Sequence, residues 1–113
     1  MHELSLMEEV LRQALMAAAA EGATCIEAIT LRVGDLAGVE EDALRFAFPV
    51  VIEGSIAQGA ELRIEREAAL CACAACDESF PARDGCCECP RCGTISRRLI
   101  SGRELRLVAL EVH

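Results

Sequence analysis

The chain has 113 residues, 19 acidic and 11 basic side chains, and a formal net charge of −8. This length allows one ordinary domain, or a small domain with a metal-stabilised extension, but not two independent hydrophobic cores. The negative charge and the 3% aromatic content disfavour nucleic-acid binding, which needs clustered basic side chains and aromatic stacking surfaces. No apolar stretch is long enough to span a membrane and no targeting signal is apparent, so we expect a cytoplasmic protein.

The first predicted element is an amphipathic helix that ends near Gly22. Its apolar positions recur at three- and four-residue steps, at Leu4, Met7, Val10, Leu11, Ala14, Leu15 and Ala18. Residues 25–33 follow as a strand with alternating apolar positions. A second helix is expected to begin near Glu40, and Pro49 lies within its apolar pattern as a potential kink.

Two more strands are predicted, one around Leu62 and Ile64 and one over residues 105–112. The elements together indicate an α+β fold, in which two helices pack on a small sheet of about three strands and a zinc-ribbon-like subdomain is inserted. The expected domains are residues 1–68 plus 101–113 and the cysteine-rich segment 69–100.

Seven of the eight cysteines lie between residues 71 and 92, which favours a reduced metal site over a disulfide framework when no secretion signal is present. Two Cys-x-x-Cys pairs, Cys73 with Cys76 and Cys89 with Cys92, have the spacing of a four-thiolate zinc site. Such a closed tetrahedron leaves no position for water or substrate, so the metal is expected to be structural.

Other ligand combinations are open at this point. Cys86 also forms a Cys-x-x-Cys pair with Cys89, and Cys71 or Cys87 could replace one ligand of the quartet. Cys25 lies far from this segment in the sequence and is interpreted as a core thiol, because free cysteines are among the most buried residues.

The N-terminus offers a second candidate site. His2 follows Met1 directly, so the terminal amine, the backbone nitrogens of residues 2 and 3 and the imidazole can surround one ion in an arrangement that suits nickel or copper. The alternative is a solvated terminus. Glu40 belongs to an acidic cluster that either stabilises a helix N-terminus or completes a metal site with Glu3, provided that the loop after Val33 returns to the N-terminus.

Taken together, the Met1-His2-Glu3 start, the following helix, the strand ending at Gly34, Glu40 and the doubled Cys-x-x-Cys resemble the HypA/HybF family. These proteins are nickel metallochaperones for maturation of [NiFe]-hydrogenase. The resemblance implies a nickel-binding domain with ligands Met1, His2, Glu3 and Glu40, and a zinc-binding domain with ligands Cys73, Cys76, Cys89 and Cys92. Ni(II) would be the transported ion and Zn(II) the structural one.

The resemblance further implies a HypB-type GTPase and the [NiFe]-hydrogenase large-subunit precursor as partners, and it leaves a homodimer open. The chain carries none of the common catalytic motifs, so we expect that it is not an enzyme. Two alternatives are a zinc-ribbon module that docks on protein or nucleic acid without handling nickel, and a thiol redox enzyme that uses one Cys-x-x-Cys pair.

Overall fold

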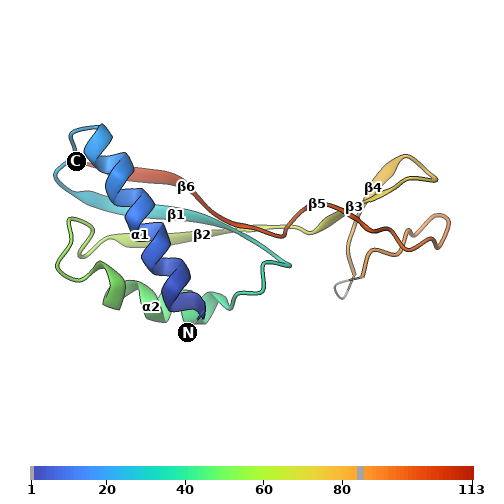
Figure 1. Ribbon diagram of the computed structural model, residues 1–113, viewed down its shortest axis with the longest axis horizontal. Helices are drawn as coiled ribbons and strands as arrows, with labels where there is room; N and C mark the ends of the chain where they lie inside the picture. Colours follow the sequence, from blue (N-terminus) through green and yellow to red (C-terminus); the bar gives the residue numbers. More distant parts are fainter. Residues whose placement is uncertain (1, 84–85) are drawn as a thin grey trace. The chain divides into compact units, whose positions relative to one another are not determined.

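The computed structural model describes residues 2–83 and 86–113. Its elements in chain order are α1 (His2–Ala20), β1 (Ile26–Gly34), α2 (Glu41–Ile52), β2 (Glu61–Glu67), β3 (Leu70–Cys73), β4 (Glu78–Pro81), β5 (Arg98–Ser101) and β6 (Leu105–Val112) (Figure 1). The strands form two three-stranded sheets, with the orders β2-β1-β6 and β4-β3-β5. The expected α+β class with two helices is therefore confirmed, and the cysteine-rich segment has a sheet of its own.

The chain separates into two compact units. Unit 1 comprises the residues up to Arg32, Val39–Glu65 and Arg106–His113, whereas unit 2 comprises Val33–Gly38 and Arg66–Leu105. Unit 1 contains both helices and most of the first sheet, and unit 2 contains the second sheet.

Helix α1 buries the apolar face that its sequence predicts, through Met7, Val10, Ala14 and Ala18. The helix ends in a Schellman motif. Gly22 adopts a positive φ of 67°, its N–H donates to the carbonyl of Ala19 at 3.0 Å, and the N–H of Ala23 donates to Ala18 at 2.9 Å. These bonds satisfy carbonyls that a helix end otherwise leaves without partners, which confirms Gly22 as the stop.

Helix α2 connects two parallel strands. The N–H of Ile26 donates to Ile56 and the N–H of Asp35 donates to Glu67, both at 2.9 Å, so β1 and β2 run in the same direction. Parallel neighbours need a crossover, and α2 supplies it. The helix continues through Pro49 to Ile52, and it buries Leu44, Ala47, Phe48 and Ile52.

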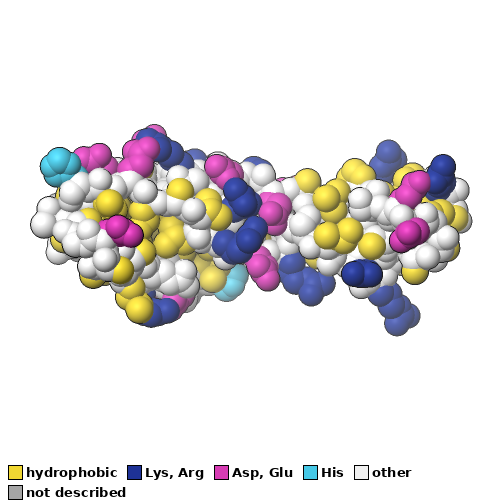
Figure 2. Space-filling model, turned by 90° about the horizontal axis from the view of Figure 1, so that it is seen from above, with side chains coloured by type: hydrophobic (Ala, Val, Ile, Leu, Met, Phe, Trp, Pro, Cys, Tyr) yellow, Lys and Arg dark blue, Asp and Glu magenta, His cyan; other side chains and the backbone are white. Residues whose placement is uncertain are grey.

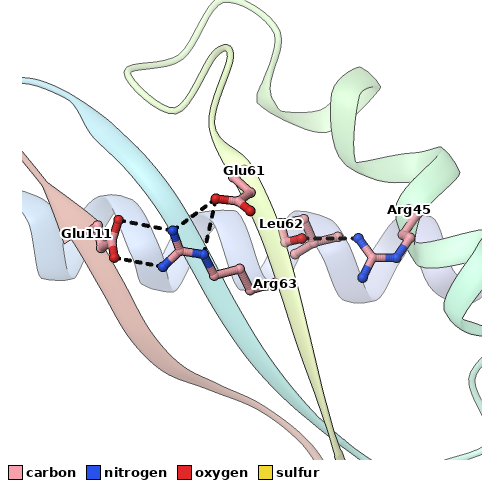
Figure 3. Close-up of polar contacts among 5 residues, drawn as sticks. All are labelled: Arg45, Glu61, Leu62, Arg63 and Glu111. Carbon is pink, nitrogen blue, oxygen red and sulfur yellow. Dashed lines mark hydrogen bonds and ion pairs between the residues drawn. The ribbon is translucent and has the colours of Figure 1, made fainter.

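Strand β6 runs antiparallel to β1, because Cys25 and His113 exchange backbone hydrogen bonds of 3.3 and 2.8 Å. On this sheet Arg63 of β2 reaches across β1, donating to Glu61 in its own strand and to Glu111 of β6 at 2.7 Å (Figure 3). Arg45 of α2 donates to the carbonyl of Leu62 at 3.1 Å and so ties the helix to β2.

The core of unit 2 is made largely of sulfur. Its main cluster buries Cys71, Cys73, Phe80 and Cys89, and the partly buried residues packed against them are Cys76, Ala82, Cys87 and Leu99. Val33 and Ala69 are the other buried apolar side chains among the described residues of the unit. Strand β3 lies in the middle of the sheet and pairs antiparallel with β4 and β5. So few apolar side chains cannot stabilise a unit of this size alone, and cross-links are the usual substitute in small units.

Arginines on the face drawn in Figure 2 are scattered among acidic side chains, so this face carries no continuous basic patch. Within the part of the chain that the structure describes, neither helix combines the length and the apolar character needed to cross a membrane.

Candidate metal centre

The four cysteines of the predicted quartet lie together in unit 2. The Sγ atoms of Cys73 and Cys92 are 3.6 Å apart, those of Cys76 and Cys89 are 4.0 Å apart, and all four lie within 4.8 Å of one another. A tetrahedral zinc with Zn–S bonds of about 2.3 Å separates its sulfurs by about 3.8 Å. The number, type and spacing of these donors therefore fit a structural zinc ion.

The two Cys-x-x-Cys segments have the same local geometry. The N–H of Asp77 donates to the carbonyl of Cys73 and the N–H of Gly93 donates to that of Cys89, each at 2.9 Å. Asp77 and Gly93, each directly after the second cysteine of its pair, have positive φ values of 54° and 76°. Asp77 thus takes the left-handed conformation that glycine provides in the second segment, and aspartate is among the few residues that tolerate it.

Further contacts hold the two segments beside each other. Arg91, inside the second Cys-x-x-Cys pair, forms an ion pair with Glu78 of β4. The hydroxyl of Ser96 donates to the carbonyl of Ala72 in β3, between Cys71 and Cys73. These bonds join the chain around the first Cys-x-x-Cys pair to the chain around the second pair.

Hydrogen bonds set unequal pKa values within the quartet. The side chain and backbone of Thr94 lower the pKa of Cys92 to about 6, and its hydroxyl lies 3.2 Å from Sγ of Cys92. The pKa of Cys76 is raised to about 12, first by the hydrogen bond with Cys92 and then by burial. Cys92 is therefore more readily ionised than Cys76, and the thiolate is the form of cysteine that binds a metal. No motif in the sequence indicates this contribution of Thr94.

Two of the alternative ligands bond to each other. Cys71 and Cys87 form a disulfide, although the clustering of the cysteines predicted a reduced segment, and Cys86 is an exposed free thiol. The sequence contains a signal for this pair, because Cys71 and Cys87 each precede a cysteine of the quartet by two residues. Side chains two residues apart in an extended chain point to the same side. Cys71 and Cys87 can therefore lie on the same side of their segments as Cys73 and Cys89, next to the quartet. Cys25 is a half-buried free thiol in unit 1.

The structure describes only part of the predicted N-terminal site. Met1 lies outside the described residues, and His2 is the exposed first residue of α1. The carboxylate of Glu3 accepts a hydrogen bond of 3.3 Å from the backbone N–H of Glu40, so the loop after Val33 does return to the start of α1. Among the described residues, the cysteine quartet alone forms an assembled group of three or more metal-ligating side chains.

Electrostatics keep Glu3 ionised. Hydrogen bonds from its own amide and from the amide of Glu40 lower the pKa of its carboxyl group. Glu40 itself is the exposed N-cap residue of α2, and its side chain makes no capping hydrogen bond. A cation at the start of α1 would meet the carboxylate of Glu3, which this hydrogen bond holds in place, beside the backbone of Glu40.

Comparisons with known proteins agree on one family. Residues 1–112 match the family model described as "HypA: Hydrogenase/urease nickel incorporation, metallochaperone, hypA". Proteins named hydrogenase maturation factor HypA are 42% identical in Picosynechococcus, with 99% of each chain covered, and 44% identical in Chloroflexus aurantiacus, with 98% of each covered.

Solved structures give the same result for the fold. A solution structure of a HypA protein has a TM-score of 0.72 at 27% identity, over 100% of this chain and 97% of that one. The solution structure of the nickel metallochaperone HypA from Helicobacter pylori also gives a TM-score of 0.72, at 22% identity, over 97% of this chain and 96% of that one.

Proposed function

Because the chain belongs to the HypA family of hydrogenase/urease nickel-incorporation metallochaperones, we propose that it carries Ni(II) to the [NiFe]-hydrogenase large-subunit precursor. Members of this family are maturation factors and not enzymes, so the proposed activity is transfer of an ion without turnover. The HypB-type GTPase is the proposed partner in this transfer.

The nickel ligands in this proposal are the amine of Met1, His2 and Glu3, with Glu40 as an additional acidic residue. The supporting observation is the hydrogen bond from the Glu40 amide to the Glu3 carboxylate, because it brings these sequence-distant residues together. The first amides of a helix have no intrahelical acceptor, so those of His2 and Glu3 are not committed to α1. Nitrogen and oxygen ligands suit a carrier, since thiolates would hold a soft metal more firmly.

The second part of the proposal is a structural Zn(II) at Cys73, Cys76, Cys89 and Cys92. Its support is the agreement between the measured sulfur distances and a tetrahedral zinc thiolate site. We also propose that the ions divide between domains, with nickel in residues 1–68 plus 101–113 and zinc in residues 69–100. The zinc would supply folding free energy to a unit whose apolar core is small.

Metal analysis of untagged protein tests both sites, and the chain offers a matched control because it has only two histidines. Wild type, His2→Ala and His113→Ala are compared by elemental analysis and by nickel titration calorimetry. We expect one zinc in all three proteins, and nickel binding in wild type and His113→Ala but not in His2→Ala. Equal nickel binding by all three would contradict the N-terminal site.

A second comparison tests the position of the terminal amine. An uncleaved N-terminal tag moves the amine away from His2 and removes the chelate rings, whereas a C-terminal tag leaves them intact. We therefore expect nickel binding to be lost only with an N-terminal tag that itself binds no metal. Retained binding in that protein would show that the amine is not a ligand.

A further inference from the structure

The cysteines outside the quartet include a pair that lies beside the metal centre. Cys71 and Cys87 are disulfide-bonded, 16 residues apart in sequence, with a Cα–Cα distance of 5.7 Å that is typical of native disulfides. Cys71 and Cys73 are alternate residues of β3, and both side chains are buried in the same cluster. Cys87 precedes Cys89 by the same two-residue step.

The disulfide joins the two chain segments that the metal would also join. Cys71 precedes the first Cys-x-x-Cys pair and Cys87 precedes the second, so this bond and the quartet are neighbouring links between the same two stretches. Besides sulfur, the buried cluster contains only Phe80, with Ala82 and Leu99 packed against it. Loss of the metal would therefore leave the disulfide as a covalent link between these two stretches, in addition to the Arg91–Glu78 ion pair and the Ser96–Ala72 hydrogen bond.

We propose that Cys71 and Cys87 form a reversible redox modification site whose disulfide holds the two Cys-x-x-Cys segments together when the metal is absent. The reactants are a low-molecular-weight disulfide as oxidant and the corresponding thiol as reductant. Persistent disulfides are rare in reducing compartments, where those that form are usually transient and redox-responsive.

Exposure indicates the order of the two exchange steps. Cys71 is fully buried, whereas Cys87 is half-buried and accessible to a small reagent. The deprotonated sulfur of Cys87 attacks the oxidant, forming a mixed disulfide as the oxidant's S–S bond breaks and one thiol leaves. The sulfur of Cys71 then attacks Cys87 and releases the second thiol. Two protein thiols are oxidised, the oxidant is reduced to two thiols, and excess thiol reverses both steps.

Cys86 provides the matched control. It is adjacent to Cys87, but it is exposed and free in the structure. A general effect of thiol oxidation near the metal centre would involve Cys86 at least as strongly as Cys87. The proposed site instead predicts that the effect of oxidation on the metal centre requires Cys87 and does not require Cys86.

The first experiment maps disulfides in untagged, zinc-loaded protein incubated with glutathione disulfide and then alkylated. Peptide mass spectrometry is expected to recover Cys71 linked to Cys87. In the Cys71→Ser, Cys86→Ser double variant, the second step is blocked, so a glutathionyl group should accumulate on Cys87. Recovery of Cys71 as a free thiol, or linked to Cys86, would overturn the proposal. This readout does not depend on which metal the N-terminus carries.

The second experiment measures metal retention, a readout that rests on the proposed zinc site. Zinc release to a chromogenic chelator is followed in oxidised and dithiothreitol-reduced wild type, Cys86→Ser and Cys87→Ser. We expect release to be about tenfold slower in the oxidised form of wild type and of Cys86→Ser, with no redox difference in Cys87→Ser. Equal release from oxidised and reduced wild type would overturn the stapling role, whereas absence of zinc from every preparation would instead contradict the proposed zinc site.

Discussion

The carboxylate of Glu3, in the first turn of α1, accepts a hydrogen bond of 3.3 Å from the backbone N–H of Glu40, which precedes α2. The contact joins positions 37 residues apart in the sequence. It satisfies a backbone donor at the start of α2 and fixes one of the carboxylates proposed to bind nickel. The bond can therefore be tested in two ways, by its effect on stability and by its effect on nickel binding.

A pH dependence follows from this contact. Amide hydrogen bonds lower the folded-state pKa of Glu3 below its ordinary value of 4.5, so the ionised form stabilises the fold. This stabilisation is fully present above the unfolded-state pKa and is lost as the pH falls through the folded-state pKa. We expect the difference in Tm between wild type and Glu3→Gln to be constant near neutrality and to disappear in acid. A Tm difference that grows in acid would contradict a lowered pKa of Glu3 in the folded state.

The two left-handed positions of the Cys-x-x-Cys segments predict unequal responses to substitution. Gly93→Ala forces a Cβ into a positive φ of 76° and should lower the free energy of unfolding of the zinc-loaded protein by about 1 kcal/mol. Asp77→Gly removes a Cβ from the equivalent position and should stay within about 0.5 kcal/mol of wild type. Chemical denaturation of both variants measures the difference. Equal destabilisation by the two variants would contradict the idea that Asp77 and Gly93 occupy the same left-handed position.

Gly34 and Gly102 meet too closely for side chains. A Cβ on Gly34 would lie 2.2 Å from the carbonyl carbon and oxygen of Gly102, and backbone atoms cannot move aside as a side chain would. Gly34→Ala should therefore destabilise the protein by about 3 kcal/mol, the upper end of the range for overpacking. Gly59→Ala is the control, because Gly59 has a positive φ of 82° but no neighbouring atom within 4 Å of the position that a Cβ would take. Its expected destabilisation is about 1 kcal/mol.

Metal removal should expose the unequal thiols of the quartet. Thr94 lowers the pKa of Cys92 to about 6, whereas the pKa of Cys76 is raised to about 12, so only Cys92 of these two is largely ionised at neutral pH. After chelation, iodoacetamide should modify Cys92 well before Cys76, as measured by peptide mapping over time. Thr94→Val should slow modification of Cys92 specifically. Equal rates of modification at the two cysteines would contradict the difference between their pKa values.

The sequence by itself determined the two helices and the three strands of the first sheet, but it did not predict β3, β4 and β5. Apolar periods of 3.6 and 2 residues identify both helices and the strands of the first sheet, because these periods place one face of each element on the core. Gly22 was identified as a helix stop for a local reason, namely its tolerance of positive φ. The spacing of Cys73, Cys76, Cys89 and Cys92 likewise indicated the quartet, since two intervening residues allow one turn to direct both sulfurs inward.

Only the tertiary structure decided which distant residues meet. That Glu3 contacts Glu40 depends on the path of the loop after β1. That Gly34 lies against Gly102 depends on where the end of β1 meets the connection between β5 and β6. The pairing of Cys71 with Cys87 was equally hidden, because a set of eight cysteines allows many connectivities and only spatial proximity selects one. Local patterns report which face of an element is buried, whereas the partner across that face is set by packing of the whole chain.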